Sequence, residues 1–385
     1  MRLRVLLSAG FILMTAGFAS AQRTLDYDRV VVQQTRIDAR DLGYPPLDVI
    51  PNGESAITSL TVAPDGILYG ATSGKRSHLF MLNPRHGYVQ PLGFLPGVTA
   101  VTHALAVSLG GEVYVGGSPG GHLLKYAPKG EGDRPSKAQE ACEVTDLGQA
   151  IGGESIFTLT LDRNSNTIYG LTAPNAHFFR YSIEAKEFSD LGAVAREAPE
   201  GEKFEVEKMV SRMLALDGKG NVYCSGENGS LFRYDKGKQK LEKLNLQAPA
   251  VPGREPWTRV DAFLSESPGF IYGGTSDGYL FRLDPDKLAI QNLGKPLHQY
   301  RMAGMAKAPN GKIYGVGGDE DEMARLFSYD PGTASYEILG FVDVNRRAYY
   351  TWQAYVVKAM AVGLDGTVYI GQGERISRLY LFYPW

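Results

Sequence analysis

Short apolar segments alternate with polar turns along most of this chain, and the alternation repeats as a unit. Residues 269–285, GFIYGGTSDGYLFRLDP, show the unit clearly: a turn, a strand containing Tyr-Gly, a second turn and a strand containing Leu-Phe. Repeats of this kind, with several short strands in each, are typical of β-propellers. The pattern therefore predicts an all-β, seven-bladed β-propeller, because the unit occurs seven times with its anchor tyrosine 42 to 55 residues from the next: Tyr69, Tyr114, Tyr169, Tyr223, Tyr272, Tyr314 and Tyr369.

Most units end in an outer strand that closes with Leu-Gly, but the last unit stops at Leu379–Trp385 without one. The missing form, Ala39-Arg40-Asp41-Leu42-Gly43, lies far away, near the N-terminus. We therefore expect the N-terminal segment to complete the last blade and close the ring. Such closure pairs a sheet edge that would otherwise be open to aggregation.

The first residues have the features of a secretory signal peptide. Arg2 and Arg4 precede an apolar run from Val5 to Phe18, and Ala19-Ser20-Ala21 supplies small residues for cleavage. The expected organisation is a signal peptide over residues 1–21 and a single propeller domain over residues 22–385. The protein is then secreted, to the periplasm or outside the cell.

Composition excludes two classes of partner. The segment 1–21 contains two of the 40 basic residues and none of the 42 acidic ones, so the mature chain has a net charge of −4. Nucleic-acid-binding proteins carry a basic excess instead. No internal apolar run reaches the roughly 18 residues of a membrane span.

Several smaller features are expected to lie outside the functional site. Cys142 and Cys224 fall at distant positions of the repeat, so we expect two thiols rather than a disulfide. The polar insertions at 129–141 and 193–208 are expected to be solvated loops. The turn Asp319–Glu322 is an exposed acidic turn or, alternatively, a calcium site.

Residues that break the repeat are the candidates for function, and two aligned positions at one end of the blades are rich in ionisable groups. The position that starts the innermost strand is occupied by Thr58, His103, Phe157, Arg212, Asp261, Ala303 and Lys358. The position before the third strand is occupied by His78, His122, His177, Ser230, Tyr279, Arg325 and Arg378. Each residue alone is typical of a structural or solvated group, but their concentration at one end indicates a site.

The connections between blades add aromatic and basic residues at the same end. Aromatic rings stack on sugars, and guanidinium groups hold carboxylates or sulfates through two hydrogen bonds. The expected partner is therefore an anionic polysaccharide or oligosaccharide. We expect it to contact Trp257, Arg259, Asp261, Tyr300, Arg301, Arg325, Trp352, Tyr355, Lys358, Arg378 and His78.

Familiar catalytic motifs are absent: there is no Gly-x-Ser-x-Gly elbow, His-Glu-x-x-His, Cys-x-x-Cys or phosphate loop. No cofactor is expected. Zinc held by His78, His122 and His177 is a minor alternative, and a structural metal stays open.

The seven units, the secreted start and the histidines His103 and His122 resemble the bacterial seven-bladed polysaccharide lyases that cleave uronate-containing glycans, ulvan lyases among them. The resemblance covers the whole mature chain in architecture. Its most specific part is the histidine pair, nineteen residues apart, at the starts of the innermost and third strands of one blade. It implies that the pair lies in the substrate groove with a Tyr and an Arg nearby.

Elimination from a uronate needs a base for the C5 proton, an acid for the leaving oxygen and a cation on the carboxylate. A neutral His can be the base, since its ordinary pKa is about 6.5. Our hypothesis makes His103 the base, His122 the acid or a carboxylate contact, and Arg212 the carboxylate clamp. His177 and Tyr279 are alternative acids.

Two other functions remain open at this point. A propeller glycoside hydrolase acting on rhamnose–glucuronate linkages would need two carboxylates, and the aligned positions offer only Asp261, with Glu54 and Glu154 a few residues before their strands. A propeller that binds a glycan or a protein without catalysis would use the same face.

Overall fold

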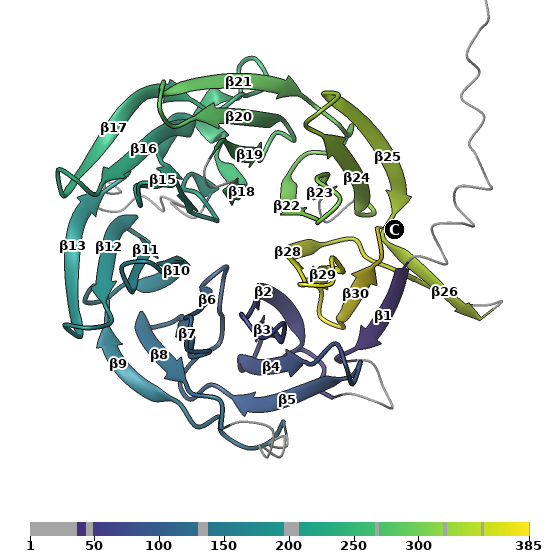
Figure 1. Ribbon diagram of the computed structural model, residues 1–385. Coiled ribbons are helices and arrows are strands. Elements are labelled where there is room, and N and C mark those ends of the chain that lie inside the picture. The colour runs from purple at the N-terminus through teal and green to yellow at the C-terminus, as the bar shows by residue number, and fades with distance from the viewer. Residues whose placement is uncertain are drawn as a thin grey trace, which may run out of the picture.

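The structure is a computed structural model that describes residues 37–43, 49–129, 138–195, 208–265, 269–318, 322–347 and 350–384. Seven four-stranded antiparallel sheets stand around a common axis (Figure 1). The seven-bladed β-propeller predicted from the repeat is therefore confirmed. The expected signal peptide, residues 1–21, lies outside the described residues.

In blades 1 to 6 the strands run outward from the axis in chain order. Blade 1 contains β2 (Ala56–Val62), β3 (Leu68–Ser73), β4 (His78–Leu82) and β5 (Val89–Phe94). Blade 2 contains β6 (Leu105–Val107), β7 (Val113–Gly116), β8 (His122–Tyr126) and β9 (Thr145–Gln149). Blade 3 contains β10 (Ser155–Asp162), β11 (Thr167–Ala173), β12 (His177–Ser182) and β13 (Glu187–Ala193).

The second half of the ring follows the same order. Blade 4 contains β14 (Ala215–Leu216), β15 (Val222–Ser225), β16 (Ser230–Asp235) and β17 (Lys240–Gln247). Blade 5 contains β18 (Val260–Ser265), β19 (Ile271–Thr275), β20 (Leu280–Asp284) and β21 (Ala289–Gly294). Blade 6 contains β22 (Met302–Lys307), β23 (Ile313–Gly317), β24 (Arg325–Asp330) and β25 (Ser335–Phe341).

Blade 7 is built from both ends of the chain. It contains β28 (Val357–Val362), β29 (Val368–Gln372), β30 (Arg378–Phe382) and, as its outer strand, β1 (Ile37–Asp41). β1 pairs antiparallel with β30, with Ala39 opposite Tyr380. The predicted closure by the N-terminal strand is confirmed.

The Tyr-Gly pair of the repeat has a packing reason. The glycine after the anchor tyrosine faces an aromatic ring on the third strand, and a side chain in its place would collide with that ring. A Cβ added at Gly273 would lie 2.0 Å from Phe281, and one at Gly70 would lie 2.1 Å from Phe80. Blades 3 and 6 repeat the arrangement with Gly170 and Phe179, and with Gly315 and Phe327.

The seven anchor tyrosines are packing residues, as expected, and each is at most 3% exposed. Several of them contact an aromatic residue on the third strand of the next blade. The ring centroids of Tyr169 and Tyr234 lie 5.4 Å apart, and those of Tyr314 and Phe382 lie 5.4 Å apart. The same repeat position thus packs its own blade and joins it to its neighbour.

Elements outside the blades are few in the described residues. Two short 3-10 helices, η2 (Glu227–Gly229) and η3 (Glu255–Trp257), lie in turns and connections. A hairpin of β26 (Asp343–Arg347) and β27 (Tyr350–Gln353) separates blades 6 and 7 and projects outward from the ring (Figure 1). The sequence analysis did not foresee this hairpin, because we treated these residues as a plain connection on the binding face.

The remaining structural expectations have mixed outcomes. Cys142 and Cys224 are both buried and are not joined in a disulfide, as predicted. The greater parts of the insertions 129–141 and 193–208, and most of the acidic turn Asp319–Glu322, lie outside the described residues.

We predict that Gly273→Ala destabilises the protein by about 2 kcal/mol, because the new methyl group must displace the Phe281 ring from a filled core. The free energy of unfolding, measured by urea denaturation, checks this. Gly152→Ala is the matched control, since a Cβ there meets no heavy atom within 4 Å. Equal stability of the two variants would refute the packing explanation of the Tyr-Gly pair.

Candidate functional site

The innermost strands meet at the axis, and their starting residues converge there on a buried carboxylate. Asp261 is fully buried at the start of β18. Arg259 donates from Nε to Asp261 Oδ1 at 2.6 Å, and Arg301 donates from Nε to Oδ2 at 3.4 Å. Arg212 Nε lies 3.4 Å from Oδ1. We call Arg212, Asp261, Arg259 and Arg301, with His103 and Lys358 beside them, the axial cluster.

Positive charge dominates the axial cluster. Burial alone would raise the pKa of Asp261, but the arginines around it outweigh burial and lower it to about 2. Asp261 is therefore ionised at neutral pH. The described side chains of the cluster thus bring three arginines to one ionised carboxylate, with Lys358 beside them.

His103 is neutral in this setting. Burial lowers its pKa to about 3, and the nearby cations act in the same direction, whereas Asp261 opposes them. A neutral imidazole keeps a free electron pair on one ring nitrogen, so it can accept a proton.

The backbone of His103 is held by the blades on both sides. Its N–H donates to Thr58 O in blade 1 at 3.1 Å, and its C=O accepts from Leu159 N in blade 3 at 3.2 Å. Its φ of 48° lies in the left-handed region, which costs a residue with a side chain roughly 1 kcal/mol or more. The neighbouring blades fix this conformation.

The two arginines Arg259 and Arg301 come from different connections, and one turn positions both. The N–H of Ser276 donates to Arg259 O at 2.9 Å, and the N–H of Arg301 donates to Ser276 O at 2.8 Å. The N–H of Arg259 also donates to Ser276 Oγ at 3.2 Å. The turn after β19 thereby aims both guanidinium groups at Asp261.

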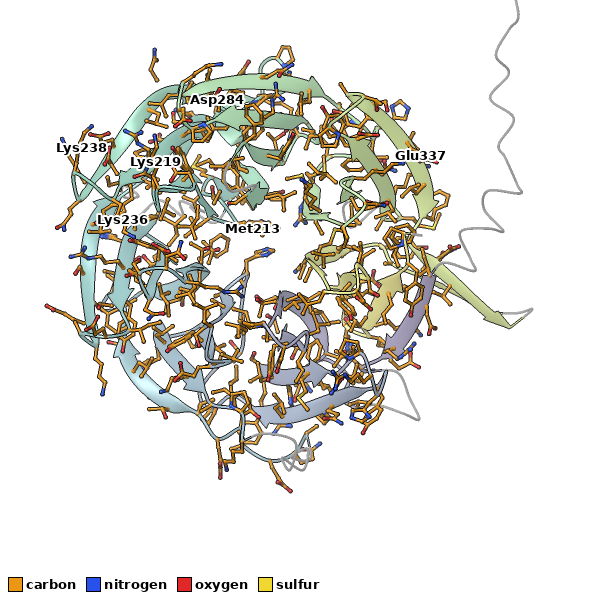
Figure 2. The ribbon with its side chains drawn as sticks, viewed as in Figure 1. Met213, Lys219, Lys236, Lys238, Asp284 and Glu337 are labelled. Carbon is orange, nitrogen blue, oxygen red and sulfur yellow. The ribbon has the colours of Figure 1, made fainter. Side chains whose placement is uncertain are left out.

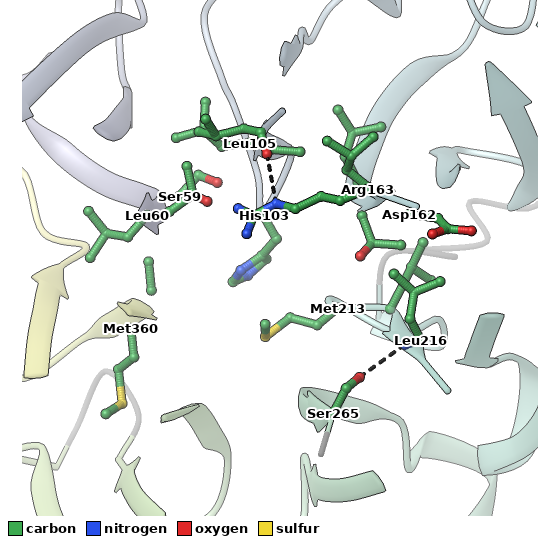
Figure 3. A pocket seen from close by; sticks show the side chains of 18 of the residues that line it. Ser59, Leu60, His103, Leu105, Asp162, Arg163, Met213, Leu216, Ser265 and Met360 are labelled. Carbon is green, nitrogen blue, oxygen red and sulfur yellow. Dashed lines mark hydrogen bonds between the residues drawn. The ribbon is translucent and has the colours of Figure 1, made fainter. Parts of the chain in front are cut away.

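A cavity of about 440 Å³ runs along the axis beneath the cluster, with His103 and Lys358 among its lining residues. The His103 ring points into this space, across from Met213 (Figure 3). Figure 2 shows Met213 near the centre of the ring, whereas Lys238 and Glu337 lie at its outer wall. The imidazole is thus accessible from the axis.

The three histidines that start third strands do not join this cluster, and each contacts an acid of its own blade. His78 is fully buried and its Nε2 lies 2.6 Å from Glu54 Oε2. His122 Nδ1 lies 2.8 Å from Asp146 Oδ2. His78, which we predicted to contact the substrate, has its side chain fully buried against Glu54 in this structure.

His177 repeats the arrangement of His122 in blade 3. Its Nδ1 lies 2.9 Å from Asp190 Oδ2 on the outer strand, and its Nε2 lies 3.9 Å from Glu154 Oε1. Third strands lie two strands out from the axis, about 10 Å by ordinary strand spacing. Their equivalent positions are therefore spread around the ring instead of gathering at one point.

The other residues of that position also serve the scaffold. Arg378 is 6% exposed, and its Nε donates to Asp41 Oδ1 of the closing strand at 3.0 Å. Arg325 lies 4.6 Å over the Phe341 ring. Tyr279 is half-buried, and its N–H donates to Thr275 Oγ1 at 3.1 Å. The structure thus places none of these three in the axial cluster.

The aromatic candidates fall into two groups. Trp257 and Tyr300 are 59% and 45% exposed, and they precede Arg259 and Arg301 in the two connections that enter the cluster. Tyr355 is 40% exposed and its N–H donates to Glu374 Oε1 beside the β26–β27 hairpin. Trp352 lies in β27 of that hairpin, and its side chain is outside the described part of the structure.

Two cations beside Tyr300 were missed by the sequence analysis. Arg254 Cζ lies 5.1 Å from the centre of the Tyr300 ring, and Lys295 Nζ lies 4.3 Å from it. Neither residue occupies an aligned repeat position, so the comparison of repeats could not select them. In the sequence, these two cations are indicated only by their place in connections that also contain Arg, Trp and Tyr.

We searched the described ranges for a metal site and for a membrane-spanning helix. In them, no three His, Cys, Asp or Glu side chains come together as a metal site would require. The same ranges contain no helix with the length and apolar character needed to cross a membrane.

Comparison with known proteins identifies the fold. No family model matches the sequence, and no curated protein matches it. Among solved structures, virginiamycin B lyase from Staphylococcus aureus is similar with a TM-score of 0.60 and 10% identity, over 90% of this chain and 98% of that one. U3-55K is similar with a TM-score of 0.59 and 13% identity, over 91% of this chain and 99% of that one.

A third similar structure is an extracellular domain from B. thetaiotaomicron, of the one component system BT4673. Its TM-score is 0.58 at 15% identity, over 91% of this chain and 40% of that chain. At these identities the likeness shows the β-propeller fold and nothing of the activity.

We predict that the His103 imidazole stays neutral throughout the physiological range and titrates only near pH 3. Imidazole nitrogen shifts followed by NMR, assigned with His103→Ala, check this. Arg212→Met should raise the pKa of His103, because a neighbouring positive charge is removed, whereas Arg282→Met on the outer part of blade 5 should leave it unchanged. Titration near the ordinary value of about 6.5 would contradict the geometry of the cluster.

We predict that Asp261→Asn lowers the free energy of unfolding by about 3 kcal/mol, because it leaves buried arginines without their shared carboxylate. Urea denaturation at neutral pH measures the change. Asp286→Asn, which removes an exposed carboxylate paired with Lys219, serves as the control with little expected effect. A stable Asp261→Asn protein would show that the cations do not depend on Asp261.

Proposed function

We propose that the protein is a secreted carbohydrate-active enzyme, a polysaccharide lyase that cleaves a uronate-containing glycan at the axial cluster. The observation that carries the proposal is a neutral histidine that faces an open cavity and lies beside a group of arginines. Guanidinium groups of this kind can hold the carboxylate of an acidic sugar. Its pyranose ring would then lie next to the His103 imidazole.

The residues can perform the elimination in one sequence of proton movements. Arg212 and Arg301 hold the uronate carboxylate and stabilise the negative charge that builds on it when the C5 proton leaves. His103 accepts that proton, the C4–O bond breaks, and a C4–C5 double bond forms. The bound carboxylate also raises the pKa of His103, because a negative charge favours the protonated imidazole.

The leaving oxygen requires a proton donor, and the position of Lys358 favours it over the histidines first considered. Lys358 lines the same cavity as His103, whereas His122 and His177 contact acids on the outer strands of their blades. In this proposal Lys358 protonates the leaving oxygen. Tyr279 stays an alternative at the edge of the face.

Hydrolysis fits the carboxylates less well. It usually needs two carboxyl groups on either side of the bond. Asp261 is surrounded by arginines, while Glu54 contacts His78 and Glu154 accepts from Asn175 at 3.0 Å. Each is already engaged in holding the fold, so elimination is favoured.

Secretion belongs to the same proposal. The start of the sequence has the features of a signal peptide, and one structurally similar protein is an extracellular domain. Another structurally similar protein is named a lyase. A binding propeller without activity is the alternative that the following experiment separates.

We predict that the protein, incubated with uronate polysaccharides, produces the ultraviolet absorbance of a conjugated double bond. His103→Ala should lower the rate at least about 100-fold, as loss of a general base does. His122→Ala should retain most of the activity, and His86→Ala, an exposed histidine away from the axis, is the matched control.

The other outcomes are distinct. New reducing ends without ultraviolet absorbance would show a hydrolase, and binding without either product would show a binding propeller. Full activity of His103→Ala would overturn the assignment of the base.

A further inference from the structure

A second cationic and aromatic group lies next to the axial cluster, on the connections that enter blades 5 and 6. It consists of Arg254, Lys295 and Tyr300, with Trp257 at its edge, and we call it the outer patch. The Tyr300 ring is 45% exposed and has two cations over it, with Arg254 Cζ at 5.1 Å and Lys295 Nζ at 4.3 Å from its centre.

The outer patch is built into the fold. Asp277, fully buried in the turn after β19, accepts from Arg254 Nε at 3.1 Å, from Thr258 Oγ1 at 3.1 Å and from Val251 N at 2.8 Å. It therefore ties the connection that carries Arg254 and Trp257 to blade 5. Because this carboxylate faces inward, it does not cover the exposed Tyr300 ring.

The connection that carries Tyr300 depends on the next residue of the same turn. A Cβ added at Gly278, whose φ is 82°, would lie 2.5 Å from Gln299 O. Glycine at this position admits the close approach of the connection, and an added Cβ would also lie 3.1 Å from Lys295 Cε. The turn Ser276-Asp277-Gly278 thus fixes the axial arginines and the outer patch together.

The two sites are adjacent along the chain. Tyr300 and Arg301 are consecutive, so their Cα atoms are about 3.8 Å apart. Arg301 is 9% exposed and turns toward Asp261, while Tyr300 stays at the surface. A ligand that reaches from one to the other must therefore extend outward from the axis over blades 5 and 6.

The pKa of Lys295 is lowered in the outer patch, so a bound anion would stabilise its positive charge. Burial lowers the pKa of Lys295 and Arg254 acts in the same direction, while Asp277 and Glu322 oppose them. The Tyr300 ring holds two cations at the surface, and together they offer charge and hydrogen-bond donors for a sugar carboxylate.

We propose that the outer patch binds a second acidic unit of the ligand whose first acidic unit occupies the axial cluster. The ligand class is then an oligomer or polymer with negative charge on more than one sugar unit, not a single acidic sugar. This inference rests on the proposed function of the axial cluster, and it names the part of the substrate that the cluster alone does not reach.

Calorimetric titration with monogalacturonate and with tetragalacturonate tests the proposal on the full protein. We expect the tetramer to bind more tightly than the monomer. Lys295→Gln should weaken tetramer binding about fivefold, and Tyr300→Ala about tenfold, with monomer binding changed less than about twofold. Tyr300→Phe should bind like the wild type, because the ring and not the hydroxyl holds the two cations in place.

Lys287→Gln is the matched control, since it removes one exposed lysine from the opposite end of blade 5, where Lys287 pairs with Asp284. Equal binding of monomer and tetramer in the wild type, or equal losses for Lys287→Gln and Lys295→Gln, would overturn the outer patch and leave the axial site in place. If only the tetramer binds, and through Lys295 alone, the axial proposal fails instead. Binding of neither ligand overturns both.

Discussion

Closing seven sheets into a ring forces one residue from each innermost strand to the same axis. At three of the seven aligned positions small or apolar side chains meet this crowding: Thr58, Phe157 and Ala303. Where ionisable groups occupy it, they must compensate one another within a few ångströms, and Asp261 among the arginines is the result. The site is therefore a consequence of ring geometry combined with departures from the repeat at a few positions.

The scaffold could be predicted from the sequence because its packing rules repeat. A glycine on the second strand goes with a phenylalanine on the third, and an anchor tyrosine goes with an aromatic residue in the next blade. Circular closure followed from counting outer strands, since one Leu-Gly strand was missing at one end and present at the other. Each of these features is local or periodic, so the spacing alone reveals it.

The candidate site could be predicted only in part. Aligned innermost positions predicted that His103, Arg212 and Asp261 would lie together, and they do. The same reasoning failed for the histidines of the third strands. We compared how high along the ring axis the residues lie, but not how far from the axis each strand lies. The histidines' partners Asp146 and Asp190 occupy the same position of the Asp-Leu-Gly outer strand, so the repeat contained this pairing, but we did not compare that position with the histidines. Contacts between connections, such as Arg254 with Tyr300, depend on loop paths that no repeat encodes.

The pairing of β1 with β30 also determines when the axial cluster can be assembled. Blade 7 is complete only when β1 pairs with β30, so the ring cannot close before the chain through β30 has been synthesised. His103 has its neighbours from blades 1 and 3 early, but Lys358 joins it only with the final blade. An incomplete chain therefore lacks Lys358 beside His103, and the axial cluster is assembled only with the last blade.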